Sequence, residues 1–132
     1  MNRHIEYLVA HCTATDQDTK ISSILRYWKT RLGWKNPGYH FIIEADGKVT
    51  QLQDLEKASN GVRGYNRNSI HVSYIGGKDI DDRTEAQKIA MTALFKGLKA
   101  MFPEAEILGH RDFPRVTKSC PRFDAVEWGN TL

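Results

Sequence analysis

The order of strand-like and helix-like segments constrains the fold of this chain most. Apolar residues recur at helical spacing in two stretches, residues 21–32 and 84–102. Short strand-like runs are bounded by turn residues and fall at positions 5–10, 38–43, 49–53, 70–75 and 106–108. The second and third runs are joined by Asp46-Gly47, which is typical of a hairpin turn. The order predicts an α/β fold with one domain over residues 1–132 and a central mixed β-sheet flanked by α-helices.

Local signals define the ends of the two predicted helices. The first is expected to end at Gly33, because glycine adopts a left-handed conformation at low cost. The second begins with Thr84 and Gln87, which fit a capping box, and Pro103 ends it. The predicted buried stripes are Ile21, Ile24, Leu25, Trp28 and Leu32 in the first helix, and Ile89, Ala90, Ala93, Leu94, Leu98, Met101 and Phe102 in the second. A last helical turn is expected at residues 124–128.

Composition and charge limit the partners that the chain is expected to have. With 132 residues, 40% hydrophobic and 27% charged, the chain is long enough for a core without disulfides. The net charge of +3 is mild, and lysine and arginine are interleaved with acidic residues, so we expect no nucleic-acid partner. No stretch is long and apolar enough to span a membrane, and Glu6 interrupts the first apolar run, which argues against a secretory signal. We therefore expect a cytoplasmic monomer without a membrane partner.

Possible metal ligands lie at non-helical positions. His11 and His110 each follow a predicted strand, and Cys120 lies in a loop. Two imidazoles and one thiolate suit zinc, and three protein ligands leave a fourth position for water, as in catalytic sites.

Other donors compete for the same role. On composition alone, His4, His40 and His71 are equally good candidates, and no compact ligand pair decides between them. Cys12 is a further rival, but in an extended strand its side chain points away from the face that carries His11. A packed thiol is the better interpretation of Cys12.

Ordered motifs from near the first residue to near the last resemble one enzyme family. They are residues 11–15 (HCTAT), 38–43 (GYHFII) with Asp46-Gly47, 64–70 (GYNRNSI) with Gly76-Gly77, 109–112 (GHRD) and 118–124 (KSCPRFD). The chain is similar to the N-acetylmuramoyl-L-alanine amidases, a family that also contains peptidoglycan recognition proteins and small phage lysozymes. The single-domain phage enzymes resemble it most.

The resemblance implies a site with one zinc ion held by His11, His110 and Cys120. It also implies that Tyr39 and Lys118 lie beside the metal as catalytic residues. The Lys118 ammonium would face the developing oxyanion, and Tyr39 would hold the attacking water or relay a proton to the leaving amine. The implied reaction is hydrolysis of the amide between N-acetylmuramic acid and L-alanine.

The resemblance leaves several biological roles open. The first is a phage or prophage endolysin that degrades peptidoglycan and reaches the cell wall only after release. The alternatives are a cytoplasmic amidase that recycles soluble muropeptides, a peptidoglycan-binding module without catalysis, and a regulator, because some phage members restrain an RNA polymerase.

One motif departs from the family pattern. Gly61-Val62 stands where the family often has a His-Ala pair that borders the substrate groove, so a contact from that histidine cannot be transferred. We expect the groove to favour a somewhat different stem peptide. Further candidates for the groove are Thr15, Trp34, Asn66, Asn68 and Arg111, although the two asparagines also suit turns and Arg111 suits an ion pair with Asp112.

Overall fold

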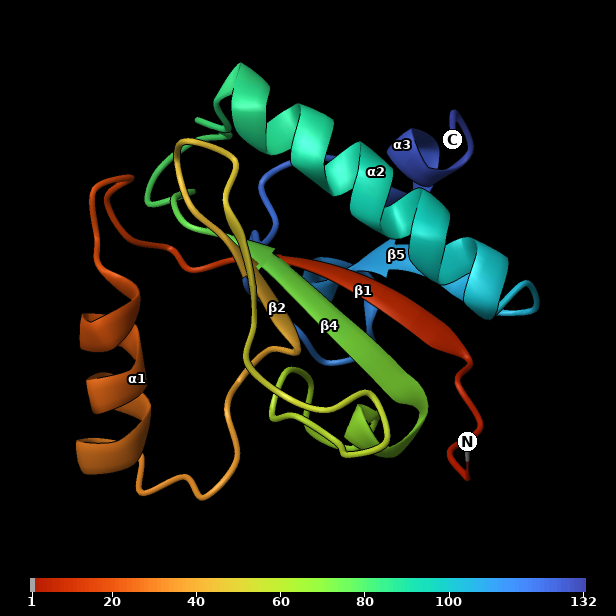
Figure 1. Cartoon of the computed structure of the whole chain (residues 1–132), viewed down its shortest axis with the longest axis horizontal. Coiled ribbons are helices and arrows are strands. Elements are labelled where there is room, and N and C mark those ends of the chain that lie inside the picture. Colours follow the sequence, from red (N-terminus) through yellow and green to blue (C-terminus); the bar gives the residue numbers. More distant parts are fainter. Residues whose placement is uncertain (1) are drawn as a thin grey trace.

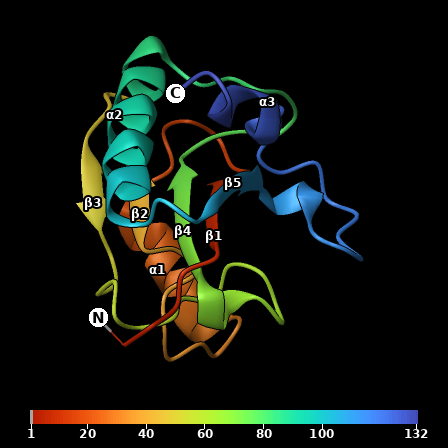
Figure 2. The ribbon, with the colours of Figure 1, turned by 90° about the vertical axis from the view of Figure 1, so that its right-hand side faces the viewer.

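A five-stranded mixed sheet forms the centre of the computed structural model, which describes residues 2–132 (Figure 1). The strands lie in the order β3-β2-β4-β1-β5. Their bounds are β1 Tyr7–Cys12, β2 Phe41–Ile43, β3 Val49–Gln51, β4 Ser69–Tyr74 and β5 Glu106–Gly109. Strand β1 pairs in parallel with β4 and β5, β2 pairs in parallel with β4, and β2 and β3 form the antiparallel hairpin. This arrangement confirms the predicted α/β fold with a mixed sheet, and Figure 2 shows β3 and β5 at its opposite edges.

Three α-helices and two 3₁₀ turns complete the fold of the described residues. They are α1 Ile21–Thr30, α2 Glu85–Met101, α3 Ala125–Gly129, η1 Asn66–Asn68 and η2 His110–Asp112. The capping box of α2 is confirmed, because Thr84 N donates to Gln87 Oε1 at 3.0 Å and Gln87 N donates to Thr84 Oγ1 at 3.0 Å. Helix α1 ends at Thr30, slightly before Gly33, which has the left-handed φ of 66°.

Side chains on one face of the sheet pack against α2. The residues from β1 are Leu8, Ala10 and Cys12, and those from β4 are Ile70, Val72 and Tyr74. They meet Met91, Phe95 and Leu98 of α2 in one apolar cluster. The predicted helical stripes were wrong at four exposed residues, Leu25, Leu32, Ile89 and Met101. In α2 the polar residue Gln87 is buried instead, because its side-chain amide donates to the carbonyls of Ile43 and Ile75.

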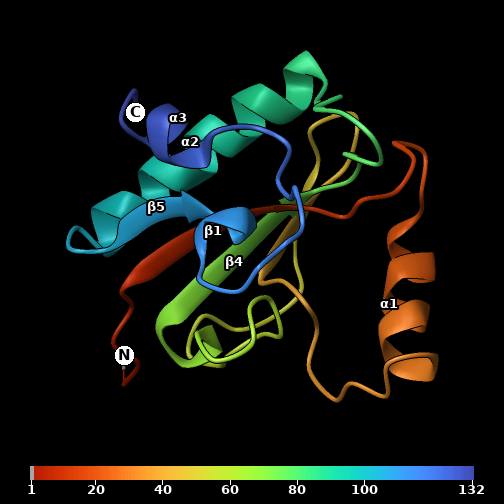
Figure 3. The same cartoon turned by 180° about the vertical axis from the view of Figure 1, so that it is seen from behind.

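The opposite face of the sheet carries α1 and a set of buried polar residues. Ile42 of β2 packs there with Ile24 and Trp28 of α1. Further along this face lie His11, His40, His71 and Ser73, all buried. Seen from behind, the segment after β5 crosses in front of β1 and β4 (Figure 3). Within the described residues, no helix is long and apolar enough to cross a membrane.

Candidate metal centre and groove

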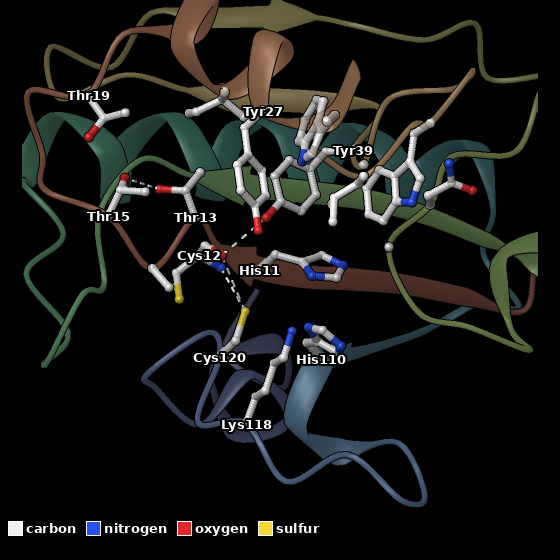
Figure 4. Close-up of a pocket in the computed structure, with 18 of the residues that line it drawn as sticks. His11, Cys12, Thr13, Thr15, Thr19, Tyr27, Tyr39, His110, Lys118 and Cys120 are labelled. Carbon is white, nitrogen blue, oxygen red and sulfur yellow. Dashed lines mark hydrogen bonds between the residues drawn. The ribbon is translucent and has the colours of Figure 1, made fainter. Parts of the chain in front are cut away.

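Three side chains that could ligate a metal converge on this second face. His11 lies near the end of β1, His110 directly follows β5, and Cys120 lies in the loop between η2 and α3. One donor atom from each residue lies within 4.8 Å of the others. Because β1 and β5 are parallel neighbours, their carboxyl ends meet at one edge of the sheet, and the two imidazole rings lie 4.8 Å apart between centroids. Figure 4 shows Cys120 and His110 facing His11 across a small gap.

His11 lies inside its strand rather than after it. The pairing of β1 with β4 continues through His11–Ser73 to Cys12–Tyr74, so the predicted strand 5–10 was displaced by two residues. The continued pairing fixes the backbone of His11 and separates its side chain from that of Cys12.

The histidines of the cluster are neutral at neutral pH. Burial lowers the pKa of His11 well below its usual value, and the neighbouring His71 and His110 lower it further. Burial also lowers the pKa of His110 to about 4, with a smaller contribution from the charge of Lys118. A neutral imidazole keeps one nitrogen lone pair, which is the form that binds a metal.

The sulfur of Cys120 is buried against the backbone of β1. It accepts the N–H of Cys12 at 3.0 Å. The neighbouring Cys12 and burial raise the pKa of the Cys120 thiol. A bound cation opposes this shift, because a coordinating thiol loses its proton.

The rival donors have other surroundings. His4 is exposed, and Cys12 packs in the cluster with Leu8 and Ala10 on the far face of the sheet, as predicted for a packed thiol. His40 Nε2 donates to the carbonyl oxygen of Lys57 at 2.7 Å. His71 Nδ1 lies 2.8 Å from His11 Nε2, so His71 contacts the cluster from behind. Among the described residues, the one group of three suitable donors is His11, His110 and Cys120.

The two predicted catalytic residues lie at the same place. The ring of Tyr39 lies 5.0 Å from that of His11, and its hydroxyl donates to the carbonyl oxygen of Cys12 at 3.3 Å. Burial raises the pKa of Tyr39, so the phenol stays protonated at neutral pH. Lys118 is exposed, and Figure 4 shows its amino group directed toward Cys120 and His110.

A groove of about 700 Å³ opens over the cluster. Besides His11, His110, Cys120, Tyr39 and Lys118, it is lined by Cys12, Thr13, Ala14, Thr15, Thr19, Ser23, Ile24, Tyr27, Trp28, Leu32, Trp34, Gly38, Asn60 and Gly61. Sequence reasoning missed Tyr27, and assigned Leu32 to the core. Tyr27 is exposed on α1 and Leu32 is exposed just after the end of that helix. Apolar side chains at helical spacing are ordinarily assigned to the core.

The candidate groove residues from the sequence separate into two sets. Thr15 and Trp34 line the groove, whereas Asn66, Asn68 and Arg111 are not among the described lining residues. Asn68 donates to the carbonyl of His4 at 2.8 Å, as a loop residue does. The expected ion pair of Arg111 with Asp112 is not found within residues 2–132. The Asp112 carboxylate accepts the N–H of Gly109 instead, at 2.7 Å.

Comparison with known proteins identifies the family. Residues 1–123 match the family model described as N-acetylmuramoyl-L-alanine amidase. The chain belongs to this family. The amidase is 36% identical over 128 residues to an endolysin of Enterobacteria phage K11, covering 92% of this chain and 83% of the relative. It is 34% identical over 129 residues to an endolysin of Escherichia phage T7, with the same coverage of 92% and 83%.

Solved structures agree on the fold. The amidase superposes on the N-acetylmuramoyl-L-alanine amidase LysC from Clostridium intestinale URNW with a TM-score of 0.82 and 21% identity. The match covers 99% of this chain and 88% of that chain.

Proposed function

We propose that this amidase is a zinc-dependent endolysin that cleaves the bond between N-acetylmuramic acid and L-alanine in peptidoglycan. The observation that carries the proposal is the convergence of His11, His110 and Cys120 at the floor of the groove. The endolysin role rests on the phage relatives. The enzyme would act on the cell wall after release, as a monomer.

The donor set fits zinc in a catalytic site. Two neutral imidazoles and one thiolate are common zinc ligands, and three protein ligands leave one position open. The sheet and the loop before α3 hold the three side chains in the lining of the groove, where a bound metal would be accessible to a substrate. A zinc ion held by these three residues would supply Lewis acidity toward the amide carbonyl and would lower the pKa of a bound water.

The chain's own residues supply charge and orientation. The Lys118 ammonium lies at the rim, where it stabilises negative charge developing on the carbonyl oxygen. Tyr39 has a raised pKa and therefore acts as a hydrogen-bond donor that orients the attacking water or the leaving amine.

The aromatic wall of the groove suits the apolar faces of a glycan and a short peptide. It is built by Tyr27, Trp28 and Trp34, and Trp28 and Trp34 stack with their centroids 6.2 Å apart. A groove lined mainly by apolar and aromatic side chains, with a few convergent polar groups, is typical of a ligand-binding site.

The decisive experiment compares two substrates with zinc-loaded and chelator-treated protein. Intact sacculi and soluble anhydro-muropeptide are offered separately, and released stem peptide is measured. We expect release from sacculi that is abolished by the chelator and restored by zinc. Faster cleavage of the soluble muropeptide would favour a recycling enzyme, and no cleavage of either substrate by zinc-loaded protein would refute the proposal.

A further inference from the structure

His11 has a buried partner on the side away from the other two proposed ligands. Its Nε2 lies 2.8 Å from Nδ1 of His71, which comes from the neighbouring strand β4 and is fully buried. Because Nε2 of His11 is engaged there, Nδ1 is the ring nitrogen that remains for a metal.

The second ring nitrogen of His71, Nε2, lies beside a side-chain oxygen that can accept a hydrogen bond but cannot donate one. His71 Nε2 lies 2.8 Å from Oδ1 of Asn66. The same oxygen accepts the backbone N–H groups of Gly61 at 3.0 Å and Val62 at 2.7 Å. Two backbone donors fix the orientation of the Asn66 amide, since its NH₂ group cannot accept hydrogen bonds. His71 Nε2 must therefore carry a proton.

The hydrogen bonds from Asn66 through His71 to His11 determine which ring nitrogen of each histidine carries the proton. His11 and His71 are fully buried, and within residues 2–132 neither ring bonds to a carboxylate, so each carries one proton. With its proton on Nε2, His71 accepts at Nδ1. His11 must then donate from Nε2, which leaves the lone pair on Nδ1.

Gly61 provides the space for the His71 ring. A Cβ atom at position 61 would lie 2.3 Å from Cγ of His71, far inside contact distance. A side chain at position 61 and the observed His71 ring exclude each other. The departure from the family pattern at Gly61 is therefore matched by His71, which fills the space beneath it.

We propose that Asn66 and His71 are positioning residues that hold His11 in the tautomer with Nδ1 free for the metal. The inference rests on the proposed zinc site. In this arrangement, the hydrogen bonds from Asn66 through His71 fix both the ring orientation and the tautomer of the proposed ligand His11. Neither residue contacts the groove, so their effect on the reaction passes through His11.

The test uses two readouts on the full chain. In metal-free protein, long-range ¹H–¹⁵N NMR should show the His11 proton on Nε2. Zinc affinity is then measured by competition with a chromophoric chelator. Replacing His71 by leucine should weaken zinc binding about 10- to 100-fold, whereas His71→Asn, which keeps an acceptor near the place of Nδ1, should stay within about threefold of the parent.

Val62→Ala is the matched control, because it loosens the same loop without removing the acceptor. It should lower the melting temperature and leave zinc affinity unchanged. A His11 proton on Nδ1 would overturn the proposal. So would a His71→Leu variant that binds zinc as tightly as the Val62→Ala control, or a His71→Asn variant that binds zinc as weakly as His71→Leu. A parent protein that binds no zinc would instead refute the metal site. The two failures can be distinguished, because the NMR measurement identifies the protonated nitrogen of His11 in metal-free protein.

Discussion

The sulfur of Cys120 accepts a hydrogen bond from the backbone N–H of Cys12 at 3.0 Å, although 108 positions separate the two residues. This contact joins the loop before α3 to the end of β1, beside His11. It holds the thiol in place without a metal, so the sheet sets the geometry of the proposed ligands.

Cys120→Ala should abolish zinc binding and amidase activity together, because two imidazoles remain in place of three ligands. Metal content by mass spectrometry and release of stem peptide check this. Cys12→Ala is the control: its side chain packs on the far face, so zinc should remain and stability should fall by about 1 kcal/mol. Zinc retained at parental affinity in Cys120→Ala would show that the ligand set is wrong.

Lys118→Ala should lower kcat by about 100-fold while leaving zinc content unchanged, since the lysine contributes charge and is not a ligand. Steady-state kinetics on a soluble muropeptide measure the effect. Lys118→Arg keeps the charge and should recover part of the rate. An unchanged kcat in the alanine variant would assign Lys118 to the solvated surface.

Tyr39→Phe removes the hydroxyl and keeps the ring between Trp28 and His11. We expect kcat to fall on the order of 100-fold, with a loss in stability of about 1 kcal/mol from the missing hydrogen bond to Cys12. Kinetics and thermal melting separate the two effects. A variant as active as the parent would remove Tyr39 from the mechanism.

Metal-free protein should lose stability as the pH falls from about 6.5 to about 4. Burial lowers the pKa of His40 to about 4, so between these values the unfolded chain binds a proton that the folded chain excludes. Stabilisation is complete above the unfolded pKa and is lost as the pH approaches the folded pKa. The full loss from His40 is about 3 kcal/mol, and His110, with its pKa also about 4, changes stability in the same direction.

Urea unfolding at several pH values measures this loss. A free energy of unfolding that stayed constant between pH 7 and pH 4 would contradict the burial of His40 as a neutral ring.

Two glycine replacements should act in opposite directions. Gly61→Ala places a methyl group against the His71 ring and should destabilise the protein by about 1–3 kcal/mol. Gly97→Ala lies in the exposed part of α2 with nothing within 4 Å of the new atom, and should stabilise the protein by about 0.5–1 kcal/mol. Thermal melting checks both, and equal effects would contradict the close approach at Gly61.

Several features of the fold followed from local sequence patterns. The capping box at Thr84, the hairpin turn at Asp46-Gly47 and the strand-like runs depend on interactions between near neighbours in the chain. The alternation of side chains along β1 also placed Cys12 away from His11. The family motifs added the ligand set and the residues Tyr39 and Lys118 as predictions.

Other features depend on contacts between distant segments. Apolar periodicity alone did not show that Leu32 is exposed at the groove, or that Gln87 is buried by its hydrogen bonds to Ile43 and Ile75. The sequence left His40 and His71 equal to His11 as metal donors, because composition carries no information on which ring faces which.

The sequence by itself determined the order of elements, the caps and turns, and the types of donor available for a metal. Only the tertiary structure decided which donors meet, because β1, β4 and β5 are brought together by pairing between residues some 60 to 100 positions apart. The same pairing put His71 behind His11 and left the space at Gly61 for its ring. Local preferences act over a few residues, whereas the metal centre and its support depend on the register of the whole sheet.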